Sequence, residues 1–153
     1  MKLPEEFESY VKKGVVKRVS QSKPRAKFLI KEAEFSLEGL KERIKVIEIN
    51  DKNSNSIIKD CYDILMELIR AKLLLDGYFA SGSYAHKAEI SYLKLLRFPE
   101  EEISFLNELS YFRNGVLYYG TILDKEYAEK EIKIWFNADE IVDYKSVHER
   151  HTR

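Results

Sequence analysis

Apolar residues recur at three- and four-residue intervals through the first third of the chain, beginning at Ala26. This spacing places apolar side chains on one face of a helix, whereas a half-buried strand would alternate with period two. The sequence therefore predicts a long amphipathic helix that follows Pro24 and ends before a polar turn at 51–55. Its predicted buried face consists of Ala26, Leu29, Ile30, Ala33, Leu37, Leu40, Ile44 and Ile47.

A second long helix is predicted after that polar turn. The turn, Asp51-Lys52-Asn53-Ser54-Asn55, offers several residue types that cap helix N-termini. The helix is expected to end near Gly77, because glycine adopts the left-handed conformation in which many helices terminate. Its predicted inward residues are Ile57, Cys61, Ile64, Leu65, Leu68, Ala71 and Leu75.

Shorter helices are predicted on either side of this pair. Pro4 with two following glutamates is typical of a first helical turn, and that helix is expected to reach about Ser20. Beyond the break at 80–83, a helix is expected from about Tyr84 to Leu96. Pro99 with three following glutamates begins another, and a last helix is expected around 127–135. The inward residues of the helix after Pro99 are Ile103, Leu106, Leu109 and Phe112.

The predicted fold is all-α. No segment alternates convincingly with period two, and short polar breaks separate the helices. We therefore expect an up-and-down bundle of five or six helices, formed by residues 1–153 as a single domain. Its core is expected to span about 26–136, with a polar C-terminal tail from about 145 that includes His148 and His151.

Composition narrows the class of protein. Lys and Arg together number 26, as do Asp and Glu, so no global positive charge favours nucleic acid. The single cysteine, Cys61, cannot form an internal disulfide, and no paired Cys/His spacing predicts zinc, so we expect no metal or cofactor. No apolar run reaches the ~20 residues that cross a bilayer, which with an acidic N-terminus favours the cytoplasm. The richness in Lys and Glu is typical of thermophile proteins.

One polar residue interrupts the inward face of the helix that follows Pro99. Arg113 stands where the pattern requires an apolar side chain, and Asn114 and Gly115 follow it. Burying an unpaired guanidinium is very unfavourable, so Arg113 must pair with an internal carboxylate, open into a cleft or lie at a subunit interface. Tyr118, Tyr119 and Gly120 complete this group, which makes 113–120 the strongest candidate site in the sequence.

This stretch resembles the signature of HEPN domains, which is an Arg-Asn pair four to six residues before a histidine. Four upstream segments, 75–78, 83–86, 90–93 and 105–109, are also similar and occur in the same order. The resemblance covers roughly 26–136. It implies an α-helical bundle of the kind found in prokaryotic toxin–antitoxin and nucleotidyltransferase-linked proteins.

The resemblance also implies a homodimer, in which Arg and His from two protomers line a cleft and active members cut RNA without metal. Arg113 and Asn114 match the motif, but Tyr118 stands nearest to the position of its histidine. A tyrosine has a pKa of ~10 and stays protonated at neutral pH, so it is a poor general base. Moreover, Arg113 and Tyr118 do not share a face of a straight helix, because five residues rotate by about 140°.

Other residues offer further chemistry. His86, at a predicted helix start, is either a structural side chain or a cleft residue that transfers protons. Seven of the ten tyrosines lie between 78 and 127, where they either fill the core and interfaces or stack on bases. A basic cluster near the first turn either contacts phosphates or faces solvent. It consists of Lys12, Lys13, Lys17, Arg18, Lys23, Arg25 and Lys27.

Three functions follow from these residues. The first is a dimeric HEPN-like module without efficient nuclease activity, which binds a nucleotide, RNA or a partner protein such as a nucleotidyltransferase through Arg113, Asn114, Tyr118 and Tyr119. The second is a metal-independent, toxin-type ribonuclease in which Arg113 acts with Tyr118 or His86. The third is a helical adaptor in which Arg113 only forms an ion pair.

Overall fold

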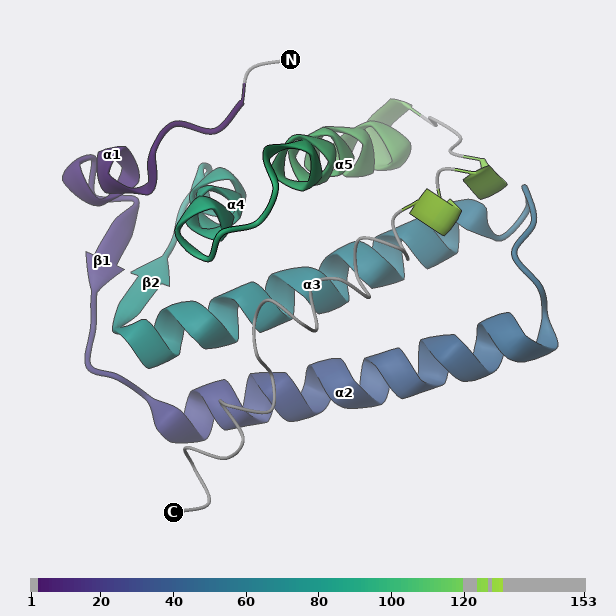
Figure 1. Cartoon of the computed structure of the whole chain (residues 1–153), viewed down its shortest axis with the longest axis horizontal. Coiled ribbons are helices and arrows are strands. Elements are labelled where there is room, and N and C mark those ends of the chain that lie inside the picture. Colours follow the sequence, from purple (N-terminus) through teal and green to yellow (C-terminus); the bar gives the residue numbers. More distant parts are fainter. Residues whose placement is uncertain (1–2, 120–123, 127, 131–153) are drawn as a thin grey trace.

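The computed structural model describes residues 3–119, 124–126 and 128–130, and for 112–119 it describes the backbone without the side chains. Helices dominate, and a two-stranded sheet is the only other element type in these residues (Figure 1). The prediction of an all-α bundle is therefore confirmed. In chain order the elements are α1 (Phe7–Lys12), β1 (Val16–Arg18), α2 (Lys23–Val46), α3 (Ser54–Asp76), β2 (Tyr78–Ala80), α4 (Ala85–Leu95) and α5 (Glu100–Tyr119).

The two long helices α2 and α3 run side by side in opposite directions (Figure 1). The predicted face of α2 is the one that packs on α3: Ala26, Ile30, Ala33 and Leu40 are buried, and Leu29, Leu37 and Ile44 are half-buried. Ile47 is exposed, because α2 ends one residue before it. The period of the apolar residues thus identified the packed face correctly, apart from its last member.

Helix α3 is buried around most of its circumference. Besides the predicted stripe, a second set of apolar residues is buried because α4 and α5 cover α3 on the side away from α2 (Figure 1). A single amphipathic stripe therefore underestimates the burial of this helix. The additional buried residues are Ile58, Tyr62, Met66, Ile69, Leu73 and Leu74.

Two asparagines close the connection between α2 and α3. The Asn53 side chain accepts a hydrogen bond from the Asn50 backbone N–H at 2.9 Å and donates to the Glu48 carbonyl at 3.0 Å. The Asn50 side chain in turn accepts from the backbone N–H groups of Lys52 and Asn53. Asn53 is the residue that precedes α3, but its side chain stabilises the loop and does not cap the helix.

The prediction for the N-terminal helix was wrong in length. Helix α1 ends at Lys12, and the residues after it form β1, which pairs antiparallel with β2. Val16 lies opposite Ala80, and Arg18 lies opposite Tyr78. Strands of three residues are too short to show an alternating pattern, and the stabilising partner of each lies far away in the sequence.

Gly77 ends α3 as predicted and passes the chain directly into β2. Its φ of 83° is a left-handed conformation that favours glycine, and its N–H bonds back to the Leu74 carbonyl. Its carbonyl accepts a 2.8 Å hydrogen bond from the Val19 N–H, which holds the end of β1 beside the end of α3. A Cβ at residue 77 would lie 3.2 Å from the Val19 carbonyl oxygen, so this close approach also requires glycine.

Helices α4 and α5 begin within one residue of the predicted positions. Leu106 and Leu109 are buried and Ile103 is partly buried, as predicted, whereas the side chain of Phe112 lies outside the described part. Phe105 and Asn107 are buried as well. Most of the last predicted helix, around 127–135, also falls outside the described residues, although Ala128 is fully buried.

Candidate functional site

A cavity of about 430 Å³ lies between α2, α3, β2 and α4. We call it the α4 cavity. Its apolar walls come from leucines of α2 and α3, and its aromatic side chains come from β2, which Gly77 places directly beside the end of α3. The charged, titratable and aromatic side chains that line it are Arg25, Arg70, Tyr78, Phe79, His86 and Glu89.

An ion pair between α3 and α4 forms one wall of the α4 cavity. Arg70 Nε donates a 2.7 Å hydrogen bond to Glu89 Oε2. The Glu89 side chain is only 3% exposed, whereas that of Arg70 is 40% exposed. Burial raises the pKa of the Glu89 carboxyl, and the charge and hydrogen bond of Arg70 oppose that rise. Arg70 therefore neutralises a buried carboxylate and also lines the cavity.

Glu89 was not among the residues predicted from the sequence, although a signal for it exists. On α4 it occupies the same face as Ala85, Ala88 and Tyr92, which are all buried. A glutamate on an apolar helical stripe must find a cation, by the same argument that was applied to Arg113. A glutamate on the apolar face of α4 indicates that Glu89 has a cationic partner. It does not indicate that the partner is Arg70, because Arg70 belongs to another helix.

His86 lies at the rim of the α4 cavity on the first turn of α4. A 3.1 Å hydrogen bond joins its Nδ1 to the hydroxyl of Tyr62, a buried residue of α3. The two rings are nearly parallel, with an interplanar angle of 6°. His86 thus has a structural contact and also lines the cavity, with an exposed imidazole, and its role in proton transfer stays a prediction. When Tyr62 donates to Nδ1, the proton of the neutral imidazole resides on Nε2.

Arg25 and Phe79 also line the α4 cavity and contact each other. The Arg25 guanidinium lies over the Phe79 ring, 5.5 Å from its centroid, which is a cation–π contact. Both side chains are exposed, and among the described residues no carboxylate pairs with Arg25. A planar cation stacked on an aromatic ring, with its outer surface open to solvent, is well suited to a planar or anionic ligand.

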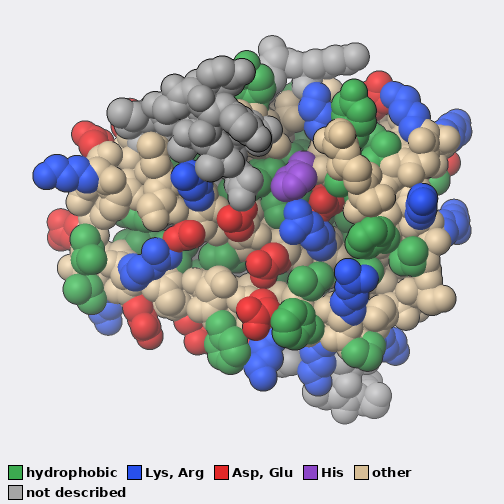
Figure 2. All heavy atoms as spheres, turned by 180° about the vertical axis from the view of Figure 1, so that it is seen from behind, with side chains coloured by type: hydrophobic (Ala, Val, Ile, Leu, Met, Phe, Trp, Pro, Cys, Tyr) green, Lys and Arg blue, Asp and Glu red, His purple; other side chains and the backbone are tan. Residues whose placement is uncertain are grey.

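The charges of the α4 cavity favour an anion. Glu89 is the one carboxylate among the lining residues and is neutralised by Arg70, so the positive charge in excess is that of Arg25. Figure 2, which views the molecule from behind, shows basic, acidic and hydrophobic side chains intermingled on that face. A cavity with apolar walls and a few convergent polar groups is the usual form of a small-molecule site.

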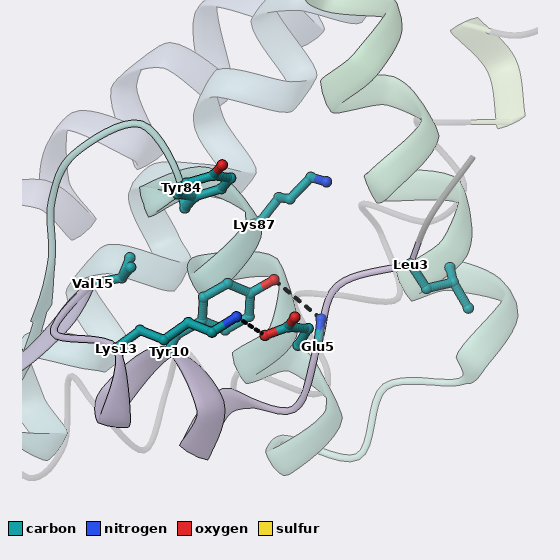
Figure 3. Close-up of a pocket in the computed structure, with 7 residues that line it drawn as sticks. All are labelled: Leu3, Glu5, Tyr10, Lys13, Val15, Tyr84 and Lys87. Carbon is teal, nitrogen blue, oxygen red and sulfur yellow. Dashed lines mark hydrogen bonds and ion pairs between the residues drawn. The ribbon is translucent and has the colours of Figure 1, made fainter.

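A second hollow, of about 280 Å³, lies between the N-terminal segment, α1 and α4 (Figure 3). We call it the α1–α4 hollow. Lys13 Nζ contacts Glu5 Oε2 at 2.6 Å, and the Glu5 backbone N–H donates to the Tyr10 hydroxyl at 3.1 Å. The hydrogen bond to Glu5 raises the pKa of the Lys13 ammonium. Tyr84 and Lys87 of α4 line the other side.

The predicted basic cluster is divided among several places. Arg25 lines the α4 cavity, Lys13 is paired with Glu5 in the α1–α4 hollow, and Arg18 lies over the Tyr78 ring at 5.7 Å. Three of its members therefore have specific contacts. The others, Lys12, Lys17, Lys23 and Lys27, are exposed.

The residues of the predicted motif lie on the last two turns of α5. The backbone of Arg113, Asn114, Tyr118 and Tyr119 is helical, and their side chains lie outside the described part. Gly120 and the histidines at 148 and 151 are also outside it. The backbone of α5 continues as a helix through Gly115. The roles assigned to these residues, including the contact that Arg113 makes, stay predictions.

Among the residues that the structure describes, no group of three or more His, Cys, Asp or Glu side chains is arranged to hold a metal ion. None of the described helices combines the length and the apolar character that a bilayer crossing requires. In comparisons with known proteins, no family model, curated protein or solved structure matches the chain.

Proposed function

We propose that this chain is a HEPN-like helical binding module that takes a nucleotide, or one nucleotide of a single-stranded RNA, in the α4 cavity. The observation that most favours this function is the Arg25 guanidinium stacked on Phe79 beside Arg70 and His86. Guanidinium groups bind phosphate through paired hydrogen bonds, and aromatic rings stack on bases. Both parts of a nucleotide therefore have a matching group in one cavity.

The size and shape of the α4 cavity support a ligand of this kind. Its volume of about 430 Å³ lies within the range of ~300–1,000 Å³ that is usual for small-molecule sites. Leucines of α2 and α3 provide the apolar surface against which a base can pack. The ion pair of Arg70 with Glu89 fixes the guanidinium in place, so that binding does not have to order it.

The HEPN-like part of the proposal rests on α5. The sequence motif of Arg113 and Asn114 supports it, and the all-α bundle is the fold class that the resemblance implies. Five residues rotate by about 140° on a straight helix, so a cleft that uses both Arg113 and Tyr118 is better supplied by two protomers, as in the dimer that the resemblance implies. We therefore include a homodimer in the proposal, and a nucleotidyltransferase as a candidate protein partner.

Replacing Arg25 with glutamine should weaken the binding of AMP and of a fluorescein-labelled octa-adenylate RNA at least fivefold, because charge-assisted hydrogen bonds contribute about 1.5–3 kcal/mol each. AMP affinity is measured by calorimetry, and RNA affinity by fluorescence anisotropy. Arg25 is exposed, so the melting temperature should hardly change. Lys45→Gln is the matched control, because Lys45 is an exposed cation in the last turn of α2. Equal affinities of Arg25→Gln and the wild type would refute the function proposed for the cavity.

A second candidate is a metal-independent ribonuclease, which the setting of His86 favours. Its imidazole is held by the Tyr62 hydroxyl at the rim of a cationic cavity. Histidine is the side chain that most often transfers protons near neutral pH, and guanidinium groups stabilise negative charge that develops on a phosphate. The resemblance adds Arg113 and Tyr118 as the alternative pair for the same two tasks.

If the chain cleaves RNA in the presence of EDTA, His86→Gln should lower the rate about 100-fold or more, which is typical for loss of a general acid or base. The comparison is with Tyr118→Phe and Arg113→Ala at equal thermal stability. Unchanged rates in both His86→Gln and Tyr118→Phe would exclude these proton-transfer roles. If RNA is neither cut nor bound and AMP and ATP do not bind, the adaptor function is the one that survives.

A further inference from the structure

The first turn of α4 separates the two hollows described above. Ala85 and His86 line the α4 cavity, whereas Tyr84 and Lys87 line the α1–α4 hollow. Consecutive Cα atoms are about 3.8 Å apart, and their side chains diverge by about 100° on a helix. His86 and Lys87 therefore mark the adjoining edges of two hollows that lie on either side of a single helical turn.

The α1–α4 hollow has one cation that is not neutralised by the residues around it. Lys13 and Glu5 neutralise each other, and Ser9 Oγ also donates to the Glu5 carboxylate at 2.6 Å. Lys87 has no carboxylate partner among the described residues. Its ammonium group extends beyond Tyr84 on the α4 side of the hollow (Figure 3). The positive charge available to a ligand here is thus that of Lys87.

An aromatic ring accompanies this cation. Tyr84 is 61% exposed and lies directly before α4. Figure 3 shows its ring across the hollow from Tyr10 and Lys13. Apolar contacts from Leu3 and Val15 complete the lining. An exposed aromatic ring beside a lysine is the combination with which proteins bind successive nucleotides of a single strand.

We propose that the ligand is a single-stranded oligonucleotide that crosses the first turn of α4. One nucleotide occupies the α4 cavity, and an adjoining nucleotide occupies the α1–α4 hollow, where its base stacks on Tyr84 and its phosphate pairs with Lys87. This inference rests on the function proposed for the α4 cavity and adds a second subsite. It explains why cationic and aromatic groups occur on both sides of the same turn.

The test compares ligands of different length on the full chain. The probes are AMP and fluorescein-labelled oligo-adenylate RNAs of two, four and eight nucleotides. The variants of the second subsite are Tyr84→Ala and Lys87→Gln. Phe35→Ala is the matched control for Tyr84, because Phe35 is also a largely exposed aromatic residue but belongs to α2. Lys45→Gln is again the control for the loss of one positive charge.

We expect the octamer to bind at least tenfold more tightly than AMP, and Tyr84→Ala to weaken octamer binding about tenfold, as is typical for loss of a base–aromatic stack. Lys87→Gln should weaken octamer binding and reduce its dependence on salt. Both variants should bind AMP like the wild type, whereas Arg25→Gln should weaken the binding of AMP and of the octamer. Neither control should change the affinity of the octamer.

Two results would overturn the second subsite. The first is equal affinity for AMP and the octamer, and the second is wild-type octamer binding by both Tyr84→Ala and Lys87→Gln while Arg25→Gln still weakens AMP. In either case the α4 cavity survives as a mononucleotide site. Failure of every probe to bind overturns both proposals together. Equal competition by a duplex of the same sequence overturns the single-stranded class, and a parallel series of DNA oligomers tests whether the ribose contributes.

Discussion

Replacing Arg70 with methionine is expected to lower the free energy of unfolding by about 2.5 kcal/mol at pH 7, because a buried carboxylate is left without its partner. That change corresponds to a fall of about 5–10 °C in melting temperature for a chain of this size. Urea unfolding followed by circular dichroism measures it. The value lies below those of fully buried pairs, since the Arg70 side chain is 40% exposed and is partly screened by water.

The loss of unfolding free energy in Arg70→Met should be larger at neutral pH than at acidic pH. Burial already raises the pKa of Glu89 above its ordinary 4.5, and removing the opposing charge of Arg70 raises it further. The folded state of the variant therefore disfavours the ionised carboxyl more strongly than the wild type does. The destabilisation should be complete above the pKa that Glu89 has in the folded variant. It should disappear as pH falls below the pKa that Glu89 has in the folded wild type, because the carboxyl is then protonated in both folded proteins. Burial raises the pKa of the Glu67 carboxyl as well and Arg70 opposes that rise, so Glu67 contributes with the same sign.

Two further variants make this prediction specific. Arg43→Met removes an arginine from a pair with Asp60 in which both side chains are more than one third exposed, so it should cost less than about 1 kcal/mol. Adding Glu89→Gln to Arg70→Met should restore part of the stability at pH 7, because the buried charge is removed. If Arg43→Met and Arg70→Met destabilise equally, the Arg70–Glu89 pair has no special role.

Replacing Leu93 with alanine should lower the free energy of unfolding by about 3 kcal/mol, the usual effect of deleting a large side chain from a close-packed core. Leu93 is fully buried in α4, which packs against both α3 and α5. The chain offers a matched control two residues later. Leu95 has the same side chain on the same helix and is 61% exposed, so Leu95→Ala should change stability by less than about 0.5 kcal/mol.

The comparison of the two leucines tests the orientation of α4 directly. Residues two apart on a helix project about 160° from each other, so only one of them can face α3. Denaturation by urea with a common slope for the three proteins allows the midpoints to be compared. A larger effect for Leu95→Ala than for Leu93→Ala would mean that α4 is rotated relative to the orientation described here.

The long helices were predictable because each has one face that repeats over many turns. The stripes from Ala26 to Ile44 and from Ile57 to Leu75 contain enough residues for the helical period to be unambiguous. Local patterns fail where the stabilising partner is remote. Residues 16–18 are too few to show the period of a strand or of a helix. Their antiparallel pairing with 78–80 makes them a strand. For that reason α1 was predicted to be too long.

The candidate site was only partly predictable. The sequence predicts that His86 is either a structural or a cleft residue. It does not identify Tyr62 as the hydrogen-bond partner of His86, because Tyr62 lies 24 residues earlier on a different helix. Arg25 was noted only as one member of a basic cluster. Its contact with Phe79 depends on the β1–β2 pairing, which the sequence does not reveal. The motif at Arg113 and Tyr118 remains a prediction for side chains beyond the described part.

The antiparallel pairing of α2 and α3 has a consequence for the order of folding events. The strand β1 precedes α2 and β2 follows α3, so docking of the two helices brings both strands to the same end of the bundle (Figure 1). Without that docking, the strands would have to close a loop of about sixty residues, at an entropic penalty that three-residue strands cannot offset. The α4 cavity includes β2 and is therefore expected to acquire affinity for a ligand late in refolding, after most helical signal has returned.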